Sequence, residues 1–173
     1  MEVTGYQLRE ALKRWQLKLD TSAKQFKESL YQFDEDQGAQ GENFNPAALS
    51  EQFQTADTAI ATLEAAQQRY NQQVEVNILG EKMPLAVAIK RVGGAGRLEK
   101  MWRGVASDTG RDRYSYREMT RDKDQIRAKR TISVQDSIKF ADEAARKAGA
   151  LRSAIATANN TKVDLSEVTD DLL

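Results

Sequence analysis

The sequence predicts an all-α protein built around a long antiparallel helical hairpin that resembles a coiled coil, and three observations support this. Two stretches of the chain share an apolar spacing that alternates between four and three residues, which is typical of helices packed along one seam. The 173 residues include only two prolines, Pro46 and Pro84, and both stand where a helix could begin. Charged residues make up 30% of the chain although long apolar seams persist, as in many helical proteins.

The two helices of the hairpin are predicted from about Thr4 to Phe33 and from Asn45 to about Leu79. An acidic, glycine-containing segment separates them. Asn45 can cap the second helix, and Pro46 suits its first position because the missing N–H has no helical partner there. The seam residues expected at the hairpin interface are Leu8, Leu12, Trp15, Leu19, Phe26 and Phe33 in the first helix and Leu49, Phe53, Ile60, Leu63, Tyr70 and Val74 in the second.

Gly80 is expected to end the second helix as a left-handed cap. Pro84 is expected to open a third helix after it. Its apolar stripe runs to Val105 but is interrupted by the glycines of residues 93–96, which indicate a kink or a close helix crossing. A phosphate-binding loop is the weaker interpretation, because the cluster lacks Walker spacing and follows a helical pattern. Residues 107–131 are polar, basic and weakly periodic, which predicts a long loop or a short hairpin.

A last helix is expected from a capping pair, Ser133 and Asp136, to about Ala158. Its seam is rich in alanine, which allows another helix to approach closely. The predicted organisation has three parts: a long hairpin over residues 1–80, a helical bundle portion over 81–160 that joins two further helices by the basic loop 107–131, and an acidic tail over 161–173.

The chain has no histidine and no cysteine, and this narrows its chemistry. Disulfides and thiolate catalysis are excluded. Without histidine, a Ser-His-Asp triad, a Cys-His pair and a His-containing zinc site are excluded as well. The acidic residues 34–36 with Glu42 lack EF-hand spacing and are interpreted as a solvated turn. The expectation is a protein that is not an enzyme, with no catalytic residue, metal or cofactor.

Charge is distributed unevenly along a chain whose net charge is zero. Residues 1–80 hold seven Lys or Arg against twelve Asp or Glu, whereas residues 90–130 hold thirteen against six. Such a dipolar chain suits stacking of its own copies, or binding of an anionic partner by the basic region. In that region arginines alternate with tyrosines, which could contact phosphates and stack on unpaired bases, unless they pair with nearby acids. The residues of this anion or nucleic-acid site would be Arg97, Arg111, Arg113, Tyr114, Tyr116 and Arg117.

The first twenty residues carry charges at helical spacing and lack the apolar core of a signal peptide. No uncharged stretch approaches the roughly 20 residues of a membrane span. The expected location is the cytoplasm, or the interior of a viral or other large assembly.

The second half of the chain is similar to a known bacterial family. The features that carry the similarity are the segment 85–91 (LAVAIKR), the element Arg113-Tyr114-Ser115, and the end of the last helix, where residues 140–142 (FAD) lead through Ile155 to residues 159–161 (NNT). Over roughly residues 80–165 they resemble the septicolysin-like family of small all-helical proteins of unknown function. The resemblance implies a helical fold and supplies no catalytic residue. Asn160 departs from the family, whose members often have tryptophan there.

The leading functional hypothesis is a non-enzymatic structural protein that forms a homo-oligomer, alone or with other assembly proteins in a larger, virion-like assembly. The first alternative is a nucleic-acid-binding accessory protein that uses residues 90–130. The second is a membrane-active, cytolysin-like assembly, as the family name suggests. A pore former must expose a sizeable apolar surface to lipid, and the alanine- and glutamine-rich seams argue against this.

Overall fold

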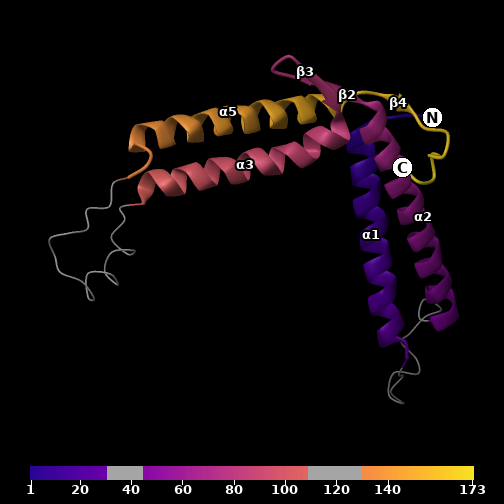
Figure 1. The fold of residues 1–173 in the computed structure, drawn as a ribbon. Helices are drawn as coiled ribbons and strands as arrows, with labels where there is room; N and C mark the ends of the chain where they lie inside the picture. Colours follow the sequence, from indigo (N-terminus) through magenta and orange to yellow (C-terminus); the bar gives the residue numbers. More distant parts are fainter. Residues whose placement is uncertain (31–44, 109–129) are drawn as a thin grey trace, which may run out of the picture. The chain divides into compact units, whose positions relative to one another are not determined.

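The computed structural model describes residues 1–30, 45–108 and 130–173, and in these the fold is all-α with a few short strands (Figure 1). The all-α prediction is therefore confirmed. The helices are α1 (Gly5–Glu28), α2 (Pro46–Gln73), α3 (Leu85–Ser107) and α5 (Val134–Ala158), and the strands are β1 (Glu2–Val3), β2 (Glu75–Ile78), β3 (Glu81–Pro84) and β4 (Val163–Asp164).

The chain forms two compact units. The first contains Met1–Val76, Pro84–Ala86 and Ala156–Leu173, and the second contains Asn77–Met83 and Val87–Ile155. This division differs from the expected three parts, because the acidic tail 161–173 belongs to the same unit as the first hairpin.

The helix starts follow the capping signals in the sequence. Thr4 Oγ1 accepts a hydrogen bond from the N–H of Gln7 at 3.2 Å, and Gln7 Oε1 accepts one from the N–H of Thr4 at 2.9 Å. These two bonds form a capping box, which satisfies N–H groups that have no helical partner. At the start of α2, the Asn45 side chain accepts from the N–H of Ala47 at 3.0 Å, and Pro46 opens the helix. Both predicted starts are confirmed.

The last helix also begins and ends where the sequence indicated. Ser133 Oγ accepts from the N–H of Asp136 at 2.9 Å and donates to the Asp136 carboxylate at 2.6 Å. The helix that follows ends at Ala158. The predicted capping pair and the predicted end are both confirmed.

The second helix ends earlier than predicted, at Gln73 instead of about Leu79. The residues after it form β2, which pairs with β3 in a two-stranded sheet. Val76 and Ile78 are buried between exposed neighbours, and this period of two is the pattern of a strand. Gly80 has the expected left-handed backbone (φ +90°), but it lies in the turn between the strands, directly after Leu79 at φ +53°. Two consecutive left-handed residues are typical of a tight type I′ hairpin.

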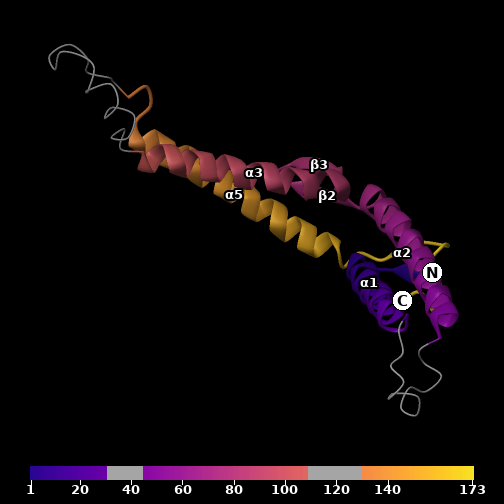
Figure 2. The ribbon, with the colours of Figure 1, turned by 90° about the horizontal axis from the view of Figure 1, so that it is seen from below.

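In the first unit, α1 and α2 lie side by side as an antiparallel hairpin (Figures 1 and 2). β1 pairs antiparallel with β4, with Val3 opposite Val163, and so joins the two ends of the chain. Beyond β4, Leu165 and Val168 are buried. These two apolar side chains hold the tail in place. They were not predicted as buried, because most of the surrounding residues are polar or acidic.

Tyr70 ties three segments of the first unit together. Its side chain is buried, and its hydroxyl lies 2.7 Å from the carbonyl oxygens of both Ala158 and Thr161, which share its single proton. Burial raises the pKa of this phenol, because the charged form loses its hydration. Beside it, a Cβ on Gly5 would lie 2.6 Å from Asn159 Oδ1 and 2.9 Å from Tyr70 Cε1. The start of α1 therefore needs glycine to approach the other segments.

In the second unit, α3 and α5 lie side by side in both views (Figures 1 and 2). The rings of Trp102 and Phe140 are 4.9 Å apart between centroids, and Arg103 pairs with Asp142 at 3.4 Å. The glycines of residues 93–96 lie inside one continuous helix, so no phosphate-binding loop forms there. The buried residues of the two helices within this unit are small with one exception: Ala88, Ala95, Ser137, Ala141, Ala144, Ala148 and Leu151.

Candidate functional site

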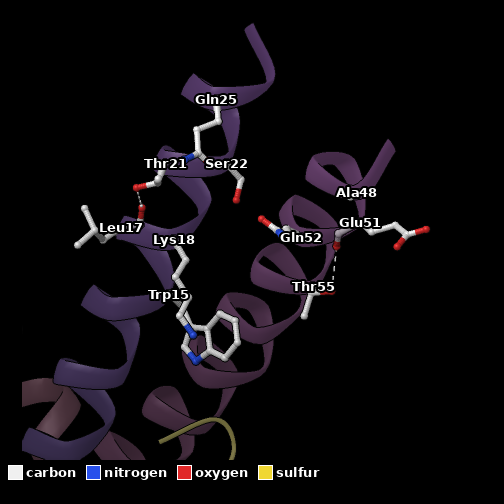
Figure 3. A pocket seen from close by; sticks show the side chains of 10 residues that line it. All are labelled: Trp15, Leu17, Lys18, Thr21, Ser22, Gln25, Ala48, Glu51, Gln52 and Thr55. Carbon is white, nitrogen blue, oxygen red and sulfur yellow. Dashed lines mark hydrogen bonds between the residues drawn. The ribbon is translucent and has the colours of Figure 1, made fainter. Parts of the chain in front are cut away.

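An open groove of about 650 Å³ lies between α1 and α2 of the first unit (Figure 3). Ser22 and Gln52 point toward one another from its two walls. Its lining residues are Trp15, Leu17, Lys18, Thr21, Ser22 and Gln25 from α1 and Ala48, Glu51, Gln52 and Thr55 from α2.

Trp15 forms one end of this groove and is fixed by the C-terminal tail. Its indole Nε1–H donates to the carbonyl oxygen of Leu172 at 2.9 Å. The Lys18 ammonium lies over the ring, 3.9 Å from its centroid, which is a cation–π contact. A second hollow of about 590 Å³ also contains Trp15, Glu51, Thr55 and Leu172 in its wall. Trp15 is half-buried, and it anchors the tail as well as the hairpin.

The chemistry of these two hollows is that of hydrogen bonding. The hydroxyls of Thr21 and Thr55 donate to the carbonyl oxygens of Leu17 and Glu51, at 2.7 and 2.9 Å, so their protons are engaged within their own helices (Figure 3). Neither threonine contacts a general base that could activate it. Among the described residues, no group of three or more Asp or Glu side chains is placed to hold a metal ion. The described residues of the two hollows thus offer polar contacts and show no arranged catalytic group.

The predicted seam residues have different positions in the structure. Leu8, Leu12, Leu49, Leu63, Tyr70 and Val74 are buried, Trp15, Leu19 and Ile60 are half-buried, and Phe26 and Phe53 are exposed. Val74 lies just after α2 in an extended conformation. Phe33 lies outside the described residues.

Alanines complete the seam that the large residues only partly form. The buried residues of α2 are Leu49, Ala56, Ala59, Leu63, Ala66 and Tyr70, which follow a strict alternation of three and four residues after an initial heptad. Phe53 instead lines an apolar slot of about 360 Å³ with Phe26 and Leu30. Ala59 and Ala66 could be found only from their spacing, since alanines also occur at many exposed positions of the same helix, such as Ala47 and Ala61.

The predicted anion or nucleic-acid site lies mostly outside the described residues, which include Arg97 but not Arg111, Arg113, Tyr114, Tyr116 or Arg117. Arg97 is exposed on α3. Two other arginines of this helix pair with acids: Arg91 with Glu81 at 2.5 Å, and Arg103 with Glu99 at 3.0 Å.

A further surface was not predicted, and it lies on the second unit. Leu98, Met101 and Phe140 are 45%, 51% and 40% exposed, although they are among the largest apolar side chains of α3 and α5. Leu98 and Met101 belong to the predicted apolar stripe of the third helix, whereas Phe140 was not among the predicted seam residues of the last helix. The structure leaves them in contact with solvent.

Comparison with known families finds no family model that matches the chain, and comparison with curated proteins finds no match. The chain is similar to a solved structure described as a functionally unknown conserved protein from Corynebacterium diphtheriae. The two share 18% sequence identity with a TM-score of 0.63, and the alignment covers 95% of this chain and 100% of the other. At this identity the likeness shows the fold alone. No helix in the described part of the chain is long and apolar enough to cross a membrane.

Proposed function

We propose that this protein is a non-enzymatic structural protein that assembles into a homo-oligomer through its helices. One observation carries the proposal: the α3–α5 hairpin buries alanines and leaves large apolar side chains exposed. Burial stabilises in proportion to the apolar area removed from water, at about 25 cal/mol per Å². An alanine seam removes little area. Leu98, Met101 and Phe140 keep 40–51% of their surface exposed, so burying the rest would contribute roughly half of the 1.5–3 kcal/mol that full burial of such a side chain gives. Association with another chain supplies that burial.

The charge pattern supports association between copies. Residues 1–80 are acidic and residues 90–130 are basic, so opposite regions of two copies attract one another. This attraction is screened by salt, with a Debye length of about 10 Å at 0.1 M. The lack of histidine and cysteine supports a non-enzymatic role, since the usual nucleophile–base pairs are excluded.

The test is the mass of the purified full chain, measured by light scattering at several protein concentrations and at low and high salt. We expect a discrete multimer that is weakened by high salt. A monomer at all concentrations would reject the proposal. If such a monomer bound single-stranded DNA or RNA at low salt, and substitution of Arg111, Arg113 and Arg117 abolished this binding, the basic stretch would be the functional surface instead.

A further inference from the structure

We infer that the apolar slot between the end of α1 and the start of α2 binds a small anionic amphiphile, a carboxylate with one alkyl chain of medium length. The slot has a volume of about 360 Å³, within the roughly 300–1,000 Å³ of small-molecule sites. All of its lining residues are described and belong to the first unit, so the site does not depend on the exposed side chains of α3 and α5.

Ser22 supplies the slot with a buried hydroxyl that has no partner. Ser22 is 6% exposed, lines the slot, and points into the space between the two helices (Figure 3). Its hydroxyl makes no hydrogen bond within residues 1–30, 45–108 and 130–173. Buried polar groups of native proteins are nearly always hydrogen-bonded, because an unpaired group has lost its hydration without compensation. The Ser22 hydroxyl is therefore free to bond to a ligand.

The slot is open because this serine occupies a seam position. Ser22 follows Trp15 by seven residues, so it stands where the seam would otherwise carry a larger apolar side chain. Phe26 and Leu30 of α1 and Phe53 of α2 line the slot and keep 37%, 54% and 38% of their surfaces exposed. A ligand whose body is apolar removes these surfaces from water, which favours its binding.

The dimensions of the slot fit an alkyl chain. Its α1 wall extends from Ser22 to Leu30, which at 1.5 Å per residue gives about 12 Å. An extended chain of roughly ten carbons has this length, because three bonds of an extended chain span about 3.6 Å. A stable protein interface uses about 20–30 residues on each side, whereas eight residues line this slot. The occupant is thus a small molecule.

Charge identifies the head group as an anion. Lys27 is the one charged residue among the eight that line the slot, and it forms no ion pair within the described part of the chain. Helical side chains lean toward the N-terminus of their helix, so the ammonium of Lys27 extends by about one turn toward Ser22. A carboxylate at this end of the slot accepts a hydrogen bond from the Ser22 hydroxyl and pairs with Lys27. Its alkyl chain then runs toward Leu30.

The first test is calorimetric titration of the full chain with octanoate, decanoate and dodecanoate, each below its micelle concentration. Each CH₂ that enters the slot should lower the dissociation constant about fourfold until the slot is full. Decyltrimethylammonium, which has a similar chain and a cationic head, should bind roughly tenfold more weakly than decanoate. The absence of binding for every alkanoate, or equal binding of the two head groups, would overturn the inference.

Two pairs of variants on α1 test the head-group position. Ser22→Ala should weaken decanoate binding roughly tenfold, whereas Ser29→Ala should leave it unchanged, because the Ser29 hydroxyl donates to the carbonyl of Phe26 at 2.8 Å. Lys27→Gln should weaken binding about two- to fivefold. Lys24→Gln should leave it unchanged, since Lys24 does not line the slot. Equal effects within either pair would reject this position of the carboxylate.

A larger side chain at Ser22 distinguishes a binding site from a packing defect. Ser22→Leu fills part of the slot and should abolish decanoate binding. Urea unfolding followed by Trp15 fluorescence in a Trp102→Phe background should give a midpoint no lower than wild type, because an unpaired buried hydroxyl is replaced by an apolar group. If Ser22→Leu lowers that midpoint, Ser22→Val replaces it as the smaller variant, under the same criterion. Retained binding in the folded variant would reject the slot as the site.

Discussion

At the scale of single residues, Gly5 is a position where packing leaves no room for a side chain. A Cβ there would meet Asn159 Oδ1 at 2.6 Å and Tyr70 Cε1 at 2.9 Å. Tyr70 is held by two hydrogen bonds, to Ala158 and Thr161, so its ring cannot easily move away. The side chain of Asn159 could rotate, but that alone leaves the contact with the ring. The glycine is therefore required by packing, since its backbone does not have a positive φ.

Gly5→Ala should lower the free energy of unfolding of the first unit by about 1–3 kcal/mol, the usual cost of overpacking. The unfolding of each unit can be followed separately by tryptophan fluorescence, because Trp15 lies in the first unit and Trp102 in the second. In a Trp102→Phe background, Trp15 fluorescence in urea reports the first unit. The matched control is Gly104→Ala in α3, where a Cβ would meet nothing within 4 Å. This control should leave the Trp15 transition unchanged, and an equal loss in both variants would contradict the packing argument.

The sequence located the hairpin seam only in part. Leu8, Leu12, Leu49 and Leu63 are large and buried, so spacing and hydropathy agree for them. Phe53 is large but exposed, whereas Ala59 is small and buried. Phe53 lies at the edge of the seam, where it lines the apolar slot with Phe26 of α1, and so it stays partly exposed. Packing against α1 decides how fully each of these positions is covered, and a single sequence does not contain that information.

At the scale of elements, helix starts were predictable because a cap is a local interaction. Thr4 and Gln7, Asn45, and Ser133 with Asp136 satisfy N–H groups within a few residues of themselves. The β2–β3 hairpin was missed because its strand pattern is short. Val74, Val76 and Ile78 alternate with polar residues for only a few positions, and the much longer helical period before them concealed the change.

The turn of that hairpin holds the backbone of Leu79 in a strained conformation. Leu79 has φ +53°, a left-handed conformation that costs an L-residue with a Cβ roughly 1–2 kcal/mol, and its side chain is 73% exposed. Leu79→Asn should raise stability by about 1 kcal/mol, because Asn-Gly is a preferred pair for a type I′ turn and no packing is lost. Gly80→Ala, at φ +90°, should lower it by a similar amount.

Thermal unfolding followed by Trp102 fluorescence in a Trp15→Phe background measures both turn variants in the unit that contains them. Opposite shifts of the midpoint are expected, upward for Leu79→Asn and downward for Gly80→Ala. Midpoints that move in the same direction would contradict a turn with two left-handed residues.

At the scale of the whole molecule, the unpredicted contacts of the first unit join residues far apart in the sequence. β1 pairs with β4, the α-amino group of Met1 pairs with Asp164 at 2.7 Å, and Trp15 donates to the carbonyl of Leu172. The second hollow beside Trp15 was not predicted for this reason, because Leu172 of the tail forms part of its wall. In the sequence, the tail is a short acidic segment, and its two buried apolar residues are too few to form a period.

The burial of Leu165 leads to a prediction about how the first unit depends on the tail. Leu165 is 2% exposed, and its N–H donates to the carbonyl of Met1 at 2.9 Å. Leu165→Ala should therefore lower the free energy of unfolding of the first unit by about 2–5 kcal/mol, as for other buried leucines. Asp170→Ala, in the same tail but exposed, should change it by no more than about 0.5 kcal/mol.

Urea unfolding followed by Trp15 in the Trp102→Phe background separates these values, and it also separates two descriptions of the chain. If residues 161–173 were an independent tail, Leu165→Ala would behave like Asp170→Ala, because neither would remove a contact with the hairpin. If the tail is part of the first unit, the Leu165 variant alone shifts the Trp15 transition. It should leave the Trp102 transition, measured with Trp15→Phe, in place, since Trp102 belongs to the other unit. The stability of the hairpin would then depend on residues that follow it by almost the whole length of the chain.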